Sequence, residues 1–371
     1  MIPIVFRTVA PDEFRIYMRA RFYKDGVCIY LPGFLYAIIG TIAVIAFSLR
    51  QGEESMIINT GARTDTVQYY TPWLLTRFAE GYALTRNPRF PDNIVRYELT
   101  PDKVDCVVFC SKNYRPILND LHRITERFRT YFQYTITAYG GDIEPGVPSI
   151  EESIGNLLEL EKQVGAARIS WRYDPVLLTG EYTIRRHKET FAYLCSRLNG
   201  HVDRCIFNFV EMYKKLIHNM PELIMLTDAA KDELAASFGE TARRYGIRLQ
   251  TCGATGDFRR YGIHPSGCVT LDILGRANGV RFRDLKHRGA RPGCRCMESR
   301  DIGAYDTCPN GCRYCYANQN PVIAAENYRR HDPDSPLLFG ALRETDVIRQ
   351  GSQASFLIQD HADGQMTLDW R

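Results

Sequence analysis

Short runs of apolar and β-branched residues alternate with amphipathic stretches from Met56 onward. Six of the runs have the length and composition of buried strands, namely 56–60, 104–110, 131–137, 168–173, 204–210 and 247–252. Between them, the spacing of apolar residues predicts helices near 70–80, 115–129, 149–165, 183–198 and 222–245. The helix at 149–165 has the clearest start, because Ser149 precedes Glu151 and Glu152 and supplies a cap.

Six strand-then-helix units predict a parallel sheet, because parallel neighbours need a crossover about the size of a helix. The uniform units favour an α/β fold of the (βα)6 type, a partial or complete TIM-like barrel, over an open doubly wound sheet. Two short runs, 82–86 and 94–99, predict a hairpin inserted before the second main strand. We therefore divide the chain into an N-terminal extension at 1–55, a barrel domain at 56–252, a cysteine-rich segment at 253–330 and a C-terminal tail at 331–371.

Polar residues follow the predicted strands at their C-terminal ends, which in a barrel form one functional rim. They are Arg63 and Asp65 after the first strand, Lys112 and Asn113 after the second, and Arg172 and Asp174 at the end of the fourth. Together they predict a site for a polar substrate or for the carboxylate and ribose of a cofactor. We assign Asn113 to cofactor binding and the other five to catalysis. The alternative is structural, with Arg172 and Asp174 forming an ion pair and Asp65 capping the first helix.

The cysteines are unevenly distributed along the chain. Seven of the twelve lie between 252 and 315. A disulfide framework is typical of short secreted chains that lack a core, whereas this chain has 371 residues, of which 45% are hydrophobic. Clustered thiols in a chain of this length favour metal ligation.

Three of these thiols follow one another closely, at Cys308, Cys312 and Cys315. Spacings of three and then two residues can wrap three corners of a [4Fe–4S] cluster and leave one iron without a protein ligand. Such an open position allows a substrate or cofactor to coordinate. Zinc is the alternative, although zinc sites more often show two well-separated C-x2-C pairs.

The C-x3-C-x2-C spacing, with the aromatic Tyr314 before the last cysteine, resembles the motif of the radical S-adenosylmethionine (SAM) enzymes. The resemblance implies that the open iron chelates the amino and carboxylate groups of SAM and that Tyr314 contacts the adenine. It also implies an external electron donor such as a ferredoxin or flavodoxin. The transferred electron cleaves the sulfonium and yields a 5′-deoxyadenosyl radical that acts on an unknown substrate.

The position of the motif differs from that superfamily, in which it usually follows the first strand. Here it follows all the strand–helix units, an arrangement that resembles an uncharacterised microbial family described only as a domain of unknown function. The likeness runs from about Met56 to Asn318 and includes the segments 63–65, 112–113, 171–175 and 301–305. The chain departs from that family's pattern at Cys110, Ser111 and Tyr114, where an aromatic residue, a threonine and a proline are expected.

Four further cysteines, Cys252, Cys268, Cys294 and Cys296, lie in the same part of the chain. They are enough for a second, auxiliary iron–sulfur cluster or for a structural zinc ion. The C-x-C pair at 294–296 is tight for one zinc ion and fits a cluster loop. The remaining alternative is that some of the four thiols bind nothing.

The segment from Arg243 to Arg300 is basic, with 13 Lys and Arg against 4 Asp and Glu. Such a surplus indicates a polyanion, an anionic cluster or a substrate carboxylate as its partner, and the alternative is an ordinary solvated surface. The second function that the sequence allows is therefore a basic nucleic-acid-binding module, stabilised by zinc and without catalysis. No stacking or groove-reading motif supports nucleic acid as the partner.

The N-terminal extension contains 23 uncharged residues at 27–49, enough for a transmembrane helix, since about 20 apolar residues suffice. Four basic residues shortly before it, Arg15, Arg19, Arg21 and Lys24, outnumber Arg50 after it. By the positive-inside tendency this would place the main domain outside the cytoplasm, where an oxygen-labile cluster is not expected. Two alternatives stay open: a cytoplasmic catalytic domain anchored to the membrane through 27–49, or a functional protein that begins at Met56.

Overall fold

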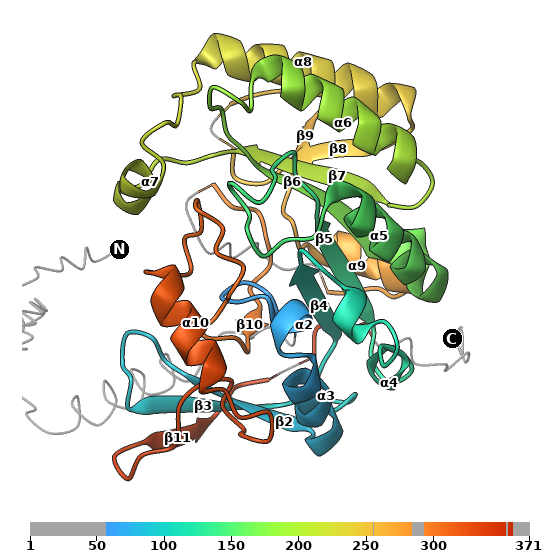
Figure 1. The fold of residues 1–371 in the computed structure, drawn as a ribbon. Helices are drawn as coiled ribbons and strands as arrows, with labels where there is room; N and C mark the ends of the chain where they lie inside the picture. Colours follow the sequence, from blue (N-terminus) through green and yellow to red (C-terminus); the bar gives the residue numbers. More distant parts are fainter. Residues whose placement is uncertain (1–56, 255, 284–292, 354, 359–371) are drawn as a thin grey trace, which may run out of the picture. The chain divides into compact units, whose positions relative to one another are not determined.

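The computed structural model describes residues 57–254, 256–283, 293–353 and 355–358 (Figure 1). The predicted transmembrane segment at 27–49 lies outside these residues. Within them, the longest helices are amphipathic, and none is both long and apolar enough to cross a bilayer.

An eight-stranded sheet with parallel pairings forms the centre of the described chain. Its spatial order is β10 (Arg300–Asp301), β1 (Ile57–Asn59), β4 (Cys106–Ser111), β5 (Thr130–Thr135), β6 (Ile169–Val176), β7 (Arg204–Phe209), β8 (Arg248–Thr251) and β9 (His264–Pro265). The six predicted strands are therefore confirmed in place and in parallel pairing. The two edge strands, β9 and β10, were not predicted, because two-residue strands carry no pattern in the sequence.

The long helices also lie where the sequence predicts them. They are α3 (Thr71–Glu80), α5 (Ile150–Val164), α6 (Ile184–Leu198) and α8 (Asp228–Arg244). Helix α5 begins with a complete capping box, in which the Ser149 hydroxyl accepts from the Glu152 amide and the Glu152 carboxylate accepts from the Ser149 amide. The start of α8 is set by Thr227, whose hydroxyl accepts from the amide of Ala230.

The prediction of one helix over 115–129 is wrong. The segment forms the 3₁₀ turn η1 (Arg115–Ile117) and the single turn α4 (His122–Thr125). Between them the backbone makes short-range bonds, from the amide of Asp120 to Ile117 and from that of Arg123 to Asp120. Asn119 and Asp120 stand where the helix would continue, and both residue types favour turns over helix interiors.

The two faces of the large sheet have different partners. Alternate strand residues, among them Val107, Phe132 and Trp171, pack with α3, α5, α6 and α8 in the main core. Their neighbours on the other face include Ile57, Val108 and Tyr131, which pack against α9 (Leu271–Asn278) in a smaller core. We call the face that carries Ile57 and Val108 the inner face.

The inner face changes character along the strands. Towards the C-terminal ends its positions are occupied by polar or sulfur-bearing residues, including Asn59, Cys110, Gln133, Arg172 and Gln250. Apolar residues and α9 therefore fill the N-terminal end of this face, and polar side chains line the opposite end.

The predicted hairpin is confirmed as β2 (Tyr82–Arg86) and β3 (Asn93–Glu98), which pair antiparallel. Strand β11 (Val347–Gln350) adds to β3 and makes a separate three-stranded sheet. The short elements are α2 (Thr66–Tyr69), η2 (Ala166–Arg168), α7 (Lys214–Asn219), η3 (Arg259–Tyr261) and α10 (Pro321–Arg329).

Candidate metal centre

The cysteine loop, residues 308–315, lies at the C-terminal ends of the strands and is held by three different parts of the chain. The amide of Gly146, in the loop after β5, donates to the carbonyl of Asn310 over 2.9 Å, and the amide of Arg313 donates to Ile143 over 3.0 Å. Tyr69, which follows β1, donates its hydroxyl to the Asn310 side chain over 3.1 Å. Tyr213, which follows β7, donates its hydroxyl to the carbonyl of Tyr314. The rest of the fold therefore determines the conformation of this loop.

Cys308 is the most enclosed of the three thiols, with 8% of the residue exposed. Burial raises the pKa of its thiol to about 12, and hydrogen bonds from the backbone amides of Asn310 and Asp65 oppose that rise. Burial also raises the pKa of the Cys312 thiol, which the ammonium of Lys112 opposes. Two backbone donors and one cation thus surround sulfur atoms that would carry negative charge as metal ligands.

Asp65 joins the first and second strand ends to the cysteine loop. Its carboxylate caps α2 by accepting from the amide of Gln68 at 3.0 Å, and it accepts the Ser111 hydroxyl at 2.7 Å and the Lys112 amide at 2.9 Å. The side chain of Asn310 approaches the same carboxylate at 3.5 Å. Burial raises the pKa of Asp65. The predicted capping role of Asp65 is therefore observed, and the Ser111 hydroxyl makes one of its contacts.

Lys112 and Tyr314 meet at a carboxylate that the sequence reasoning missed. Oε1 of Glu144 accepts the ammonium of Lys112 at 2.9 Å, the hydroxyl of Thr137 at 2.9 Å and the hydroxyl of Tyr314. The ring of Tyr314 also packs edge-on against Tyr139. Glu144 lies in the loop after the third predicted strand, so the rule that placed the other residues at strand ends applies to it as well.

Arg172 and Asp174 form the ion pair that the sequence allowed, through Nη2 and Oδ2. Nη1 of Arg172 also lies 3.1 Å from the sulfur of Cys110, which is on the same face of the sheet two strands away. Because 22% of the Arg172 side chain and 16% of the Asp174 side chain are exposed, both remain accessible to solvent.

Arg63 and Asn113 contact neither the carboxylate of Glu144 nor that of Asp174 through a hydrogen bond or ion pair among the described residues. Their polar partners include Asp301 and the backbone near η1. Arg63 lies 3.9 Å from the carboxylate of Asp301, which also accepts the amide of Ala62 at 2.7 Å. These contacts attach the chain leading to the cysteine loop to the end of β1. The side chain of Asn113 accepts the amide of Arg115 at 3.0 Å and so forms a local turn that leads into η1.

Three cysteines of the second group lie together. The sulfur of Cys252 is 3.9 Å from that of Cys294 and 3.6 Å from that of Cys296, and the three sulfur atoms are within 4.8 Å of one another. Cys268 lies beside them, because its amide donates to the sulfur of Cys296 over 3.1 Å. This arrangement is a candidate metal site. Across the described ranges it is the one set of His, Cys and carboxylate ligands that is gathered this closely.

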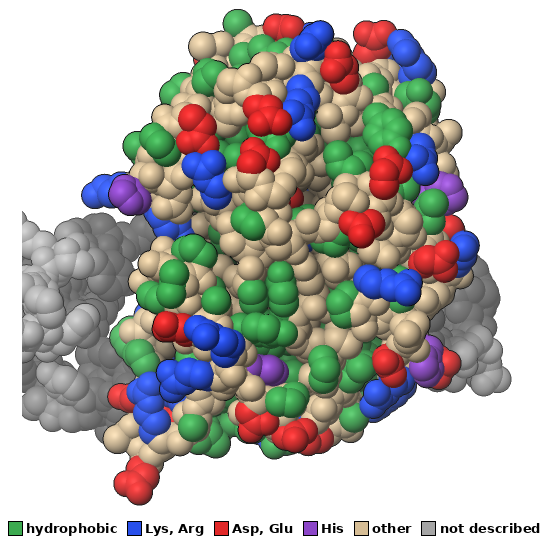
Figure 2. Space-filling view, viewed as in Figure 1, with side chains coloured by type: hydrophobic (Ala, Val, Ile, Leu, Met, Phe, Trp, Pro, Cys, Tyr) green, Lys and Arg blue, Asp and Glu red, His purple; other side chains and the backbone are tan. Residues whose placement is uncertain are grey.

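The basic segment is partly neutralised by acids from elsewhere in the chain. Arg248 pairs with Asp203, and Arg260 pairs with Asp232. On the face drawn in Figure 2, acidic and basic side chains are interspersed. This face therefore shows no single basic patch.

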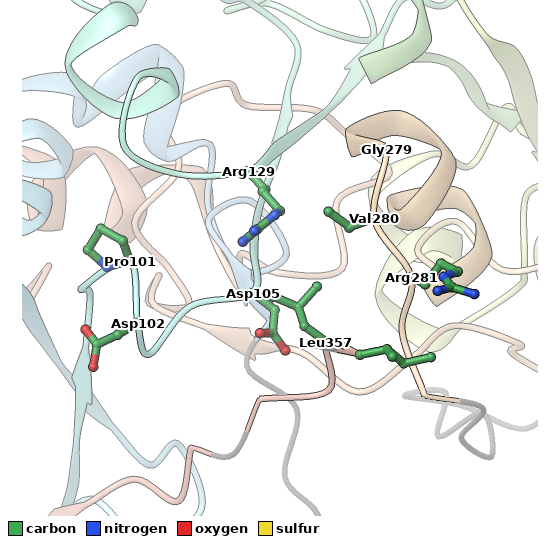
Figure 3. A pocket seen from close by; sticks show the side chains of 9 residues that line it. Pro101, Asp102, Asp105, Arg129, Gly279, Val280, Arg281 and Leu357 are labelled. Atoms are coloured by element: carbon green, nitrogen blue, oxygen red, sulfur yellow. The ribbon is translucent and has the colours of Figure 1, made fainter. Parts of the chain in front are cut away.

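A recess of about 470 Å³ lies at the other end of the strands, beside Asp105, Arg129 and Val280 (Figure 3). The carboxylate of Asp105 accepts the Ser355 hydroxyl at 2.6 Å and the Phe356 amide at 2.8 Å. Asp105 therefore holds residues 355–356 at the end of the strands opposite to both groups of thiols.

A family model described as Domain of unknown function (DUF1848) matches residues 57–317. No curated protein and no solved structure matches the chain. The matched range begins at β1 and ends just after Cys315, so it contains the whole eight-stranded sheet and all seven clustered cysteines.

Proposed function

The chain belongs to the family of the domain of unknown function DUF1848, and from its own side chains we propose that it is an enzyme of the radical SAM type. In this proposal Cys308, Cys312 and Cys315 bind a [4Fe–4S] cluster that leaves one iron open for SAM. The observation that carries it is the cysteine loop itself, where three thiols on eight consecutive residues lie among backbone donors at the C-terminal ends of a parallel sheet.

The residues present suit such a cluster. Backbone amides directed at Cys308 favour its thiolate, and Lys112 compensates charge near Cys312. The three thiols are not gathered within the 4.8 Å that groups Cys252, Cys294 and Cys296. This wider placement is suitable for a cluster, in which each thiolate binds a different iron, and is less suitable for one ion.

When bound, the cluster would supply an electron that cleaves the sulfonium of SAM to methionine and a 5′-deoxyadenosyl radical, with a ferredoxin or flavodoxin as the external donor. The need for SAM and for such donors favours a cytoplasmic catalytic domain. The chain's own residues would bind the cofactor and orient it. Tyr314, whose hydroxyl is engaged by Glu144, would present its ring to the adenine.

We assign Arg172 and Asp174 to the substrate side of this site, because they are accessible on the polar end of the inner face. Asp65 and Arg63 act as positioning residues, since their contacts join strand ends to the cysteine loop and its approach. We keep Asn113 as a cofactor-binding residue of this proposal; its side chain accepts the amide of Arg115 at the start of η1.

We also infer that the eight-stranded sheet is an incomplete barrel. Its strands follow one another in chain order from β1 to β9, and right-handed crossovers in one direction put the connecting helices on one face. A sheet wound in this way curves around its inner face. The alternative role in nucleic-acid binding has no comparable support, because acids pair with Arg248 and Arg260 of the basic segment.

The test is anaerobic purification of the full chain, followed by iron and sulfide analysis and by incubation with SAM and dithionite. We expect a brown protein that releases 5′-deoxyadenosine. Cys312→Ala should lose both the iron of this cluster and the product. Cys195→Ala, which alters a fully buried core cysteine, is the matched control and should keep both. A colourless protein, or a Cys312→Ala protein that still cleaves SAM, would contradict the proposal.

A further inference from the structure

The second cysteine group is assembled from three separate segments of the chain. Cys252 directly follows β8, Cys268 follows β9, and Cys294 and Cys296 precede β10. Although Cys252 is 44 residues from Cys296 in sequence, their sulfur atoms are 3.6 Å apart. Thiols in one short motif are close in space because they are close in sequence. Here the fold brings three separate segments to one place.

The distances between the sulfur atoms are informative about the size of the ligand. Four thiolates around one zinc ion, each about 2.3 Å from it, are about 3.8 Å from one another in a tetrahedron. The observed separations from Cys252 are 3.6 Å to Cys296 and 3.9 Å to Cys294. A cubane cluster holds its thiolates further apart, because each binds a different iron at a separate corner. The spacing of Cys252, Cys294 and Cys296 is therefore close to that expected around one ion.

Cys268 lies beside these three thiols, and its sulfur is not within 4.8 Å of all of them. Its backbone amide donates to the sulfur of Cys296 over 3.1 Å. The peptide chain around it is held by side chains of the inner face. Gln133 donates to the carbonyl of Cys268, and Gln250 donates to that of Gly267, each over 2.9 Å. An amide donor to a ligand sulfur is the kind of supporting contact that built metal sites contain.

We propose that Cys252, Cys268, Cys294 and Cys296 bind one structural zinc ion. Tetrahedral sets of four thiolates select zinc or iron–sulfur centres, and the separations above select a single ion. This site is distinct from the cysteine loop and does not depend on the radical SAM proposal.

The ion would close a gap in the sheet. Strands β9 and β10 are its two edges, with no ladder between them among the residues described. Just beyond them, the amide of Met297 donates to the carbonyl of Val269 over 2.8 Å. Zinc bound by Cys268 on one segment and by Cys294 and Cys296 on the other would join these edges. It would thereby secure β10, which leads directly into the cysteine loop.

The test uses the full chain purified anaerobically without added metal. We expect about one zinc per chain in addition to the cluster iron. A Cys252→Ser, Cys296→Ser double variant should lose the zinc, whereas Cys312→Ala should keep it. Because the double variant could fail to fold, the wild-type protein is also stripped with a chelator and reloaded with Co²⁺. Intense visible bands of tetrahedral Co²⁺–thiolate are expected in that sample.

Three results would overturn the proposal. The wild-type protein could contain no zinc and give no tetrahedral Co²⁺ spectrum, or the double variant could keep its zinc. The wild-type protein could also contain a second iron–sulfur cluster that the double variant lacks. The outcome is separable from that of the proposed function. Zinc retained by a protein that forms no 5′-deoxyadenosine supports this site while refuting the enzyme. Zinc-free protein that cleaves SAM would refute this site and support the enzyme.

Discussion

The ammonium of Lys112 lies 2.9 Å from Oε1 of Glu144, and the two side chains are only 13% and 2% exposed. The pair connects the end of β4 to the loop after β5, next to Cys312. A nearly buried pair of this kind is costly to break on one side, because the remaining charge has no nearby partner.

The effects of replacing the two members of this pair should therefore not be additive. We expect Lys112→Met and Glu144→Gln each to lower the free energy of unfolding by about 3 kcal/mol. The free energy of unfolding of the double variant should fall by clearly less than the sum of the decreases in the two single variants. Urea denaturation of the four proteins measures the coupling, and additive losses would show that the pair does not interact.

Changes at Tyr314 separate its ring from its hydroxyl. Tyr314→Phe removes one of three hydrogen bonds to Oε1 of Glu144, a loss of about 1 kcal/mol, and keeps the ring. If the ring contacts the adenine, Tyr314→Phe should form 5′-deoxyadenosine at close to the wild-type rate. Tyr314→Ala should raise the KM for SAM about tenfold, which corresponds to about 1.4 kcal/mol. Equal kinetics for the two variants would argue against the contact.

His187 should make the fold sensitive to acid. The residue is fully buried, its Nδ1 lies 2.8 Å from the Tyr173 hydroxyl, and its Nε2 lies 2.8 Å from the carbonyl of Leu177. Burial lowers the pKa of His187 from 6.5 to about 4. Because the unfolded chain takes up this proton first, the stabilising contribution is complete above about pH 6.5 and is lost as the pH falls towards 4. The full loss is about 3 kcal/mol.

The measurement compares wild-type protein with His187→Gln by urea denaturation at several pH values from 7.5 to about 4. The variant is expected to be less stable at pH 7.5, because its amide reproduces the two hydrogen bonds imperfectly. The difference between the two proteins should then shrink with falling pH. A constant difference would mean that His187 does not titrate in this range.

Gly267 should control zinc binding without being a ligand. A Cβ at this position would lie 2.5 Å from the carbonyl oxygen of Arg295 and 2.7 Å from the amide nitrogen of Cys296. Gly267→Ala must therefore push the two thiol-bearing segments apart. We expect it to weaken zinc retention at least tenfold, about 1.4 kcal/mol, in a competition with a chromogenic chelator.

The matched control for this variant is Gly155→Ala in α5, where a Cβ would meet nothing within 4 Å. It should bind zinc normally and gain up to about 1 kcal/mol of stability, because alanine favours a helix interior. Equal zinc retention in the two variants would mean that the approach of the segments is not needed for the site.

Local patterns determined most of the regular structure of this protein. The six strands, the α5 capping box and the β2–β3 hairpin depend on residues close in sequence, so apolar spacing and capping residues were sufficient to predict them. The spacing of Cys308, Cys312 and Cys315 on one loop is likewise a local pattern, and it predicts a metal-binding loop.

The tertiary structure alone decided which distant groups meet. Glu144 could not be recognised as the partner of Lys112 and Tyr314, which are 32 and 170 residues away. Asp301 reaches the amide of Ala62 across 239 residues, and Cys252 meets Cys296 across 44. Such contacts arise from the pairing of strands in space, and a sequence records the residues of each strand without their order in the sheet. That is why only the fold shows that Cys252, Cys294 and Cys296, which the sequence left open between a cluster, zinc and no ligand, gather into a candidate metal site.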